Sequence, residues 1–90
     1  MREIFETTQF RSDFKRIARS GRYKATDLLK VVDDLANNLP LGPKHRDHEL
    51  SSHWREHREC HIKPDWLLIY KLRPGRLILI RTGSHAELFG

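Results

Sequence analysis

Hydrophobic residues in the N-terminal half of the chain repeat at the spacing of one helical face. A stripe at i, i+4, i+7 and i+8 starts at Phe10 and predicts a helix over residues 9–19. Thr8 is a suitable N-cap for this helix. A second stripe predicts a helix over residues 22–38, which Pro40 ends because proline cannot continue a helix. The two helices form an amphipathic hairpin whose apolar side needs another layer to cover it.

The C-terminal half contains short apolar or alternating stretches, which are typical of strands. Residues 66–72 form a nearly continuous apolar run, as expected of a central strand. Residues 77–80 form its hairpin partner, because a Pro-Gly pair occupies the central positions of a type II turn between the two runs. Two weaker strands are predicted, one over residues 54–62 and one over residues 3–8.

Together these elements predict an α+β fold. Their order is β-α-α-β-β-β, with a last helical turn over residues 84–89. A chain of 90 residues has room for one core and not for a second, so residues 1–90 are expected to form a single domain. We therefore expect a helical hairpin packed on one face of a small antiparallel sheet.

The charge balance of the chain favours a polyanionic partner. It has 17 Lys and Arg against 12 Asp and Glu, a net charge of +5, and basic small domains bind nucleic acid, ribosomes or acidic proteins. A basic surface that only keeps the protein in solution fits the same numbers equally well. The single cysteine, Cys60, excludes an internal disulfide and suits a reducing compartment. No stretch resembles a signal peptide or a membrane span, so we expect a soluble cytoplasmic protein without membrane contact.

Histidines are the most conspicuous candidates for chemistry. The chain has six, and five of them lie within residues 45–61. Histidine readily gives and takes protons near neutral pH. Strand alternation places His57, Glu59 and His61 on one sheet face. Cys60 lies on the other, more apolar face, which we assign to the helices, so the histidine face is expected to be open.

A second group of polar residues surrounds the end of the last strand. Arg81 ends that strand, and Gly83 turns the chain so that His85 follows closely, which would let both side chains reach one phosphate. Asp65 and Trp66 lie at the mouth of the central strand. RNA cleavage needs a base for the ribose 2′-hydroxyl, an acid for the departing 5′-oxygen and a cation at the phosphate. Histidine, carboxylate and arginine supply these parts without a metal.

These residues also have structural interpretations. Histidines on a polar strand face are often solvated surface residues. Asp65 could stabilise the turn at Pro64, Trp66 could pack in the core, and Phe89 could either pin the C-terminus or be presented to a ligand. Zinc is another interpretation of the histidines. A chain with one cysteine and no Cys-x-x-Cys pair lacks a structural zinc pattern, so no metal is expected.

Three ordered motifs in the C-terminal half are more specific than any of these patterns. They are Asp47-His48-x-Leu50, Trp54-x-x-x-Arg58-x-x-His61-x-x-Pro64-Asp65-Trp66-x-Leu68-Ile69-Tyr70-Lys71 and Arg81-x-Gly83-x-His85-x-x-Leu88-Phe89. In these motifs the chain resembles the YafQ-type toxins of the RelE/ParE superfamily. The N-terminal strand and helices agree with that family in layout and less in residues.

The resemblance implies the toxin of a type II toxin–antitoxin system, one that cleaves mRNA, typically in the ribosomal A site, without a metal or other cofactor. Its implied partners are the mRNA, the ribosome and a cognate antitoxin, with operator DNA reached only through the toxin–antitoxin complex. The site residues implied by position are His48, His61, Asp65 and His85 as acid–base groups, Arg81 at the phosphate, and Phe89, Trp66 and Glu59 as substrate-binding residues.

Two other functions remain open at this point. One is a non-catalytic toxin of the same fold, such as the gyrase-targeting branch of the superfamily. The other is a basic module that binds RNA or ribosomes without chemistry. Neither needs an acid–base set gathered on one face of the sheet, so the placement of the histidines discriminates between them and a nuclease.

Overall fold

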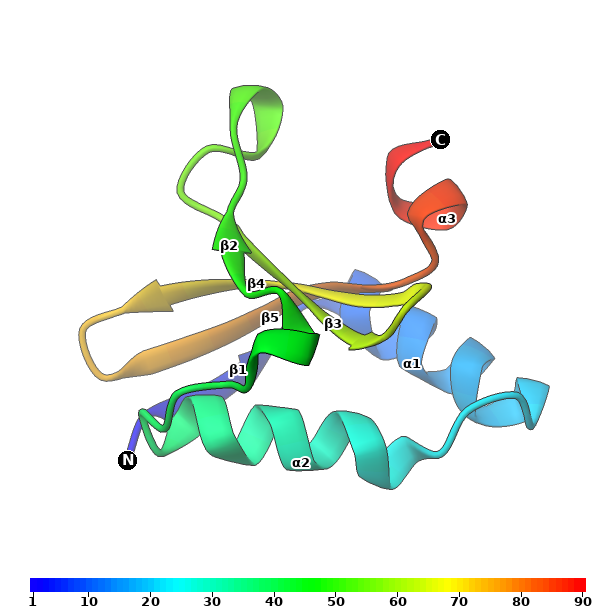
Figure 1. Cartoon of the computed structure of the whole chain (residues 1–90), viewed down its shortest axis with the longest axis horizontal. Coiled ribbons are helices and arrows are strands. Elements are labelled where there is room, and N and C mark those ends of the chain that lie inside the picture. The colour runs from blue at the N-terminus through cyan, green and yellow to red at the C-terminus, as the bar shows by residue number, and fades with distance from the viewer.

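Five strands form one sheet, and two long helices cover one of its faces (Figure 1). The computed structural model describes residues 1–90. The strands lie in the order β1-β5-β4-β3-β2. Their bounds are β1 Glu3–Glu6, β2 His48–Glu49, β3 Arg58–Lys63, β4 Trp66–Arg73 and β5 Arg76–Gly83. The helices are α1 Thr8–Ser20, α2 Ala25–Ala36 and α3 His85–Phe89, with 3-10 turns η1 at Pro43–His45 and η2 at Ser52–Trp54.

The α+β fold with a helical hairpin on one sheet face is confirmed. The sheet itself is mixed, because β1 runs parallel to β5 while β2, β3, β4 and β5 pair antiparallel. Side-chain alternation predicts a strand without its direction, so this parallel pairing is visible only in the structure. β2 has two residues and is too short to alternate. β3 begins at Arg58 rather than Trp54, because η2 and a positive φ of 67° at Glu56 interrupt the extended chain.

The ends of the helices are set by capping residues. The Thr7 side chain accepts a hydrogen bond from the Phe10 amide at 2.9 Å, so Thr7 rather than Thr8 is the N-cap of α1. Gly21 ends α1 in the left-handed conformation, with a φ of 69°. α2 is shorter than the predicted 22–38, because the chain between Gly21 and α2 is a non-helical connection and α2 ends two residues before Asn38, which has a φ of 57°.

The main core lies between the helices and the sheet. Phe10 and Ile17 of α1 and the apolar face of α2 pack on the side chains that β3, β4 and β5 direct toward them. Cys60 and Ile62 belong to this core, which confirms the predicted assignment of the two faces of β3.

A smaller apolar cluster lies on the opposite face of the sheet. Leu67 and Ile69 of β4 are completely buried there beneath Leu88 of α3, with Trp54 packed beside them. β2 and α3 project from this face at its opposite ends (Figure 1). This is the face that was expected to carry the histidines, and it is open only between β2 and α3. None of the helices combines the length and the apolar character needed to cross a membrane.

Candidate active site

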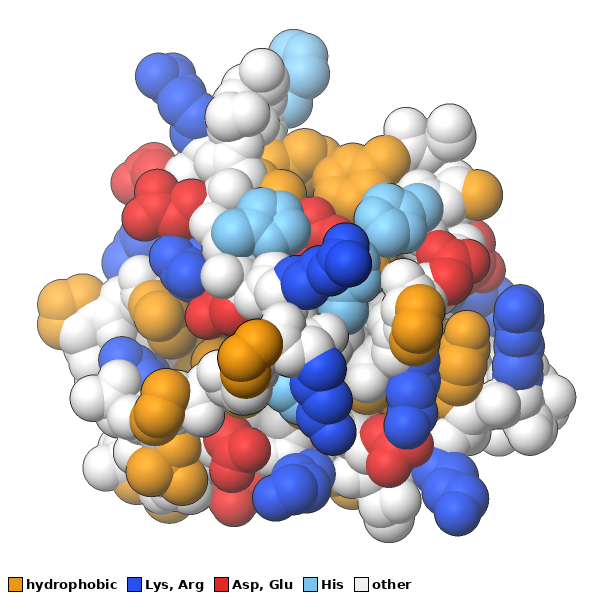
Figure 2. Space-filling view, viewed as in Figure 1, with side chains coloured by type: hydrophobic (Ala, Val, Ile, Leu, Met, Phe, Trp, Pro, Cys, Tyr) orange, Lys and Arg blue, Asp and Glu red, His pale blue; other side chains and the backbone are white.

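The gap between β2 and α3 is a cleft with a polar lining. Its volume is about 570 Å³. Histidine and basic side chains gather on this face of the molecule (Figure 2). The cleft is lined by Lys44, Arg46, His48, Glu59, His61, Pro64 and His85. Four of the residues expected at the site from the sequence, three histidines and one glutamate, are therefore brought together.

Glu59 lies at the centre of the histidines. Its Oε2 is 3.5 Å from Nε2 of His48, and its Oε1 is 3.5 Å from Nε2 of His61. The Nε2 of His85 lies 3.9 Å from the same Oε1. Glu59 is only 4% exposed, and its Oε1 has no hydrogen-bond partner. Burying a carboxylate oxygen without a donor is costly, and a catalytic role is one of the reasons for which proteins keep such a group.

The hydrogen bonds of the three histidines direct the same nitrogen of each ring toward Glu59. The Nδ1–H of His48 donates to the carbonyl of Arg46 at 2.6 Å, and that of His61 to the carbonyl of Pro64 at 3.3 Å. Carbonyl oxygens only accept hydrogen bonds, so Nδ1 carries the proton in both rings. Nε2 is thus the nitrogen left to exchange protons in the cleft.

Asp65 orients the third histidine from outside the cleft. Its Oδ1 accepts hydrogen bonds from the backbone N–H and from the Nδ1–H of His85, both at 3.1 Å. These two hydrogen bonds, backbone first, hold the pKa of the Asp65 carboxyl below its ordinary value. Asp65 is therefore a stable anion that fixes the ring of His85 and the start of α3 against the turn between β3 and β4.

His48 stands on the shortest strand of the sheet, next to an aspartate that is anchored to two other strands. Tyr70 donates a hydrogen bond to Asp47, and Nη2 of Arg58 lies 3.3 Å from the same carboxylate. Burial and the contact with Asp47 raise the pKa of the Tyr70 hydroxyl, so it remains a donor. This network ties the residue before His48 to β3 and β4.

Arg81 is not in the cleft, contrary to the expected convergence with His85. Its Nε and Nη2 donate to the two carboxylate oxygens of Asp13 in α1, each at 3.0 Å. Asp13 is completely buried. Burial alone would raise its pKa, but the hydrogen bonds, above all those from Arg81, hold the pKa below its ordinary value. Arg81 thus neutralises a buried anion beneath the sheet and joins α1 to β5.

The cations of the cleft are instead Lys44 and Arg46, which the sequence analysis missed. Both precede the Asp47-His48 motif, and neither side chain forms an ion pair. Their position immediately before that motif is a signal that the sequence did offer. His45, between them, donates its Nδ1–H to the backbone carbonyl of His61 at 2.7 Å and so holds η1 against β3.

The two aromatic residues expected at the substrate lie in different surroundings. Trp66 is completely buried, donates its Nε1–H to the hydroxyl of Thr82 at 2.9 Å and is stacked under Tyr23. In the structure its ring belongs to the core. Phe89 is 43% exposed, and its ring centre lies 6.3 Å from that of His85, at the edge of the cleft.

The cleft also contains a set of atoms that could bind a metal ion. Ligand atoms of Glu59, His61 and His85 all lie within 4.8 Å of one another. Two imidazoles and a carboxylate suit zinc or copper. No metal pattern is visible along the chain, because these residues come from β3 and α3, which are distant in the sequence and meet only in the fold.

Comparison with known proteins assigns the chain to a family. A family model described as "Bacterial toxin of type II toxin-antitoxin system, YafQ" matches residues 2–90. The chain belongs to the YafQ family. A curated relative from Escherichia coli strain B / BL21-DE3, named mRNA interferase toxin YafQ, is 43% identical over 91 residues, which cover 99% of this chain and 97% of the relative. The resemblance carried by the three motifs is thereby confirmed.

Solved structures of YafQ-like proteins have the same fold. The toxin in the E. coli DinJ–YafQ complex superimposes with a TM-score of 0.89 at 42% identity, and the match covers 100% of both chains. A metal-bound toxin from Helicobacter pylori gives a TM-score of 0.93 at 42% identity, covering 99% of this chain and 100% of the other. The mixed five-stranded sheet with three helices is therefore the YafQ fold.

Proposed function

We propose that this YafQ-family toxin is an mRNA interferase, an endoribonuclease that cleaves mRNA without a metal ion. The observation that carries the proposal is the arrangement of three Nε2 atoms, from His48, His61 and His85, around the buried carboxylate of Glu59. Imidazoles next to a carboxylate can take up and release protons near neutral pH. Lys44 and Arg46 on the same wall can bind the phosphate of RNA.

The proposed reaction is an in-line attack of the ribose 2′-hydroxyl on the adjacent phosphorus. His61 takes the hydroxyl proton on Nε2, the 2′-oxygen bonds to phosphorus, and the bond to the 5′-oxygen breaks. His85 gives its Nε2 proton to the departing 5′-oxygen, which leaves a 2′,3′-cyclic phosphate and a free 5′-hydroxyl. Lys44 and Arg46 stabilise the charge that develops on the phosphate. Asp65 was the other candidate base, but its lowered pKa makes it a poor proton acceptor.

Partners and place of action follow from the same proposal. The E. coli relative is seen in a complex with DinJ, and we expect a cognate antitoxin for this chain as well. A basic cleft is a suitable target for an acidic segment that covers the histidines and neutralises the cations. We place the substrate mRNA in the A site of the ribosome and the protein in the cytoplasm, with operator DNA reached only through the antitoxin complex.

The test compares the purified protein with its His85→Ala variant. Both are incubated with a defined mRNA, alone in EDTA and with ribosomes in a Mg²⁺ buffer that keeps the ribosomes intact, and both are expressed in cells to measure growth arrest. We expect the wild-type protein to cleave the mRNA and arrest growth, and the variant to do neither. A gyrase-targeting or purely RNA-binding toxin would arrest growth equally well without His85, and that result would overturn the proposal.

A further inference from the structure

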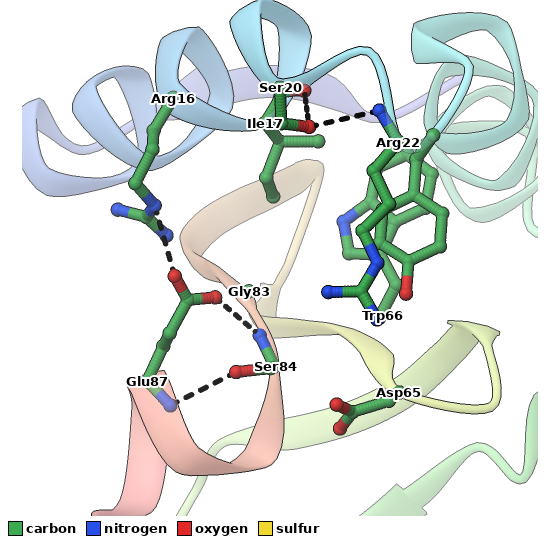
Figure 3. Close-up of a pocket in the computed structure, with 10 residues that line it drawn as sticks. Arg16, Ile17, Ser20, Arg22, Asp65, Trp66, Gly83, Ser84 and Glu87 are labelled. Carbon is green, nitrogen blue, oxygen red and sulfur yellow. Dashed lines mark hydrogen bonds and ion pairs between the residues drawn. The ribbon is translucent and has the colours of Figure 1, made fainter.

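A second cavity borders the histidine cleft on the other side of Asp65. It has a volume of about 400 Å³ and lies between the α1–α2 connection and the start of α3 (Figure 3). Asp65 lines it and also holds His85, which lines the cleft. Pockets of about 300–1,000 Å³ hold small ligands. A polynucleotide in the cleft could therefore place one nucleobase in this cavity.

Arg22 is the cation of this cavity that has no protein partner. The other arginine on its wall, Arg16, forms an ion pair with Glu87 at 3.1 Å. The guanidinium of Arg22 makes no hydrogen bond or ion pair and lies over the ring of Tyr23, 5.5 Å from its centre. It extends from the α1–α2 connection toward Asp65 (Figure 3). Its planar face is thus available to a ligand.

Tyr23, and not Trp66, is the aromatic residue whose ring faces this cavity. The Tyr23 ring stacks on Trp66 at 4.7 Å between ring centres, with an angle of 21° between the planes, and Trp66 is completely buried. The planar surface facing the cavity is therefore Tyr23 with Arg22 above it. Aromatic rings and arginine planes are the surfaces on which proteins stack the bases of single-stranded RNA.

The remaining polar groups of the cavity favour a base over a phosphate. Both carboxylate oxygens of Glu87 are engaged, one by the Ser84 amide at 2.8 Å and one by Arg16. Asp65 uses only Oδ1 for His85, so its Oδ2 is a free acceptor. A phosphate has only acceptors to offer to the Oδ2 of Asp65, whereas the N–H groups of a base can donate to it.

We propose that this cavity binds a nucleobase of the RNA next to the cleaved phosphodiester, stacked on the guanidinium of Arg22 and donating an N–H to Asp65. The inference rests on the proposed RNA cleavage and adds a contact with the substrate outside the histidine cleft. By binding this base, Arg22 and Tyr23 would position the RNA strand relative to His85.

The test measures binding separately from cleavage. A short RNA oligonucleotide with 2′-O-methyl groups throughout lacks the attacking hydroxyl and cannot be cleaved, so its affinity is a pure binding readout. The variants are Arg22→Gln, Arg22→Lys and, as the matched control, Arg19→Gln in the exposed last turn of α1, which does not line the cavity. Arg22→Lys keeps the charge and removes the plane.

Stacking of a base predicts about tenfold weaker binding for both Arg22 variants, and a change of about twofold or less for Arg19→Gln. With cleavable RNA, Arg22→Gln should raise KM and leave kcat near the wild-type value. Replacing one nucleotide next to the cleavage position by an abasic one should weaken binding to the wild type about tenfold, and binding to Arg22→Gln much less, because the two changes remove the same contact.

Equal binding by Arg22→Gln and Arg19→Gln would overturn the inference, and so would full binding by Arg22→Lys. Arg22-dependent binding without cleavage of ordinary RNA would support the base site and overturn the nuclease. A wild-type protein that does not bind the oligonucleotide but cleaves ordinary RNA, alone or on ribosomes, would overturn the base site alone. One that neither binds nor cleaves would overturn both.

Discussion

The Oε1 atom of Glu59 lies 3.5 Å from Nε2 of His61 and has no hydrogen-bond donor of its own. A buried carboxylate in this position costs folding free energy unless one of the imidazoles facing it is protonated. A proton on Nε2 of His61 or His85 would give this oxygen a donor. This is the state that a site needs in order to protonate a leaving group.

Glu59→Gln should make the protein more stable and less active. The amide removes the buried charge whose Oε1 has no donor, so the free energy of unfolding should rise by about 1 kcal/mol. Cleavage should fall by roughly 10²–10⁴-fold, because the three Nε2 atoms lose the carboxylate that faces them. Urea unfolding and single-turnover cleavage measure the two effects. Loss of stability together with full activity would show that Glu59 only supports the fold.

Tyr70→Phe should disturb the position of His48 indirectly, through Asp47. The variant removes the hydroxyl that donates to Asp47 and keeps the buried ring. We expect a loss of about 1–3 kcal/mol in the free energy of unfolding, since Asp47 loses a donor. We also expect a fall in kcat smaller than that of His48→Ala. Ser12→Ala, which removes an exposed hydroxyl of α1 that lines neither the cleft nor the second cavity, is the control and should leave kcat unchanged. An unchanged kcat in both variants would show that the hydrogen bond from Tyr70 to Asp47 is not needed for catalysis.

Removing Arg81 should destabilise the fold through Asp13. Arg81→Met leaves a completely buried carboxylate without its bidentate partner, which costs about 3–5 kcal/mol. The double variant with Asp13→Asn should recover much of this stability and should still cleave RNA, because neither residue lines the cleft. A stable double variant without activity would instead place Arg81 at the phosphate.

The Asp13 carboxylate also predicts how stability responds to acid. Its pKa in the folded protein is below the ordinary value, so its contribution to stability is complete above the pKa of an unfolded Asp, about 3.9. That contribution is lost as the pH falls below 3.9 and through the lower folded pKa. Asp13→Asn should therefore be less stable than the wild type at pH 7, and the difference should shrink as the pH is lowered toward 3. A difference that stays constant over this range would contradict the pKa direction.

Metal ions should inhibit the enzyme, not activate it. Zn²⁺ bound by Glu59, His61 and His85 would occupy the Nε2 atoms that move protons. Cleavage should be undiminished in EDTA, slow by at least about tenfold with excess Zn²⁺, and recover when EDTA is added again. His53→Ala, an exposed histidine outside the cleft, should be inhibited equally. Loss of activity in EDTA would instead make the metal a part of catalysis.

The sequence predicted those parts of the site that depend on local periodicity. Alternation along β3 placed Glu59 and His61 on the face opposite Cys60, and the structure confirms this. The last helical turn expected over residues 84–89 is likewise present as α3, with Ser84 as its N-cap. Such features follow from the backbone geometry of a few consecutive residues.

Features that depend on distant contacts could not be obtained in this way. β2 is too short to show alternation, so only the family resemblance indicated His48. Arg81 was misplaced because its partner is 68 residues earlier in the chain. A signal for that pair was present, because Asp13 lies three residues after Phe10 on the buried side of α1. A carboxylate on a buried helix face requires a cation from elsewhere in the fold.

The roles of His61 and His85 can be separated with an RNA whose departing 5′-oxygen is replaced by sulfur, a leaving group that needs no proton. Single-turnover cleavage of this substrate and of ordinary RNA is measured for the wild type, His61→Ala and His85→Ala. We predict that the sulfur substrate restores cleavage by His85→Ala to near the wild-type rate and leaves His61→Ala defective. Restoration of His61→Ala alone, or equal defects in both variants on both substrates, would contradict the assignment of His85 as the acid and His61 as the base.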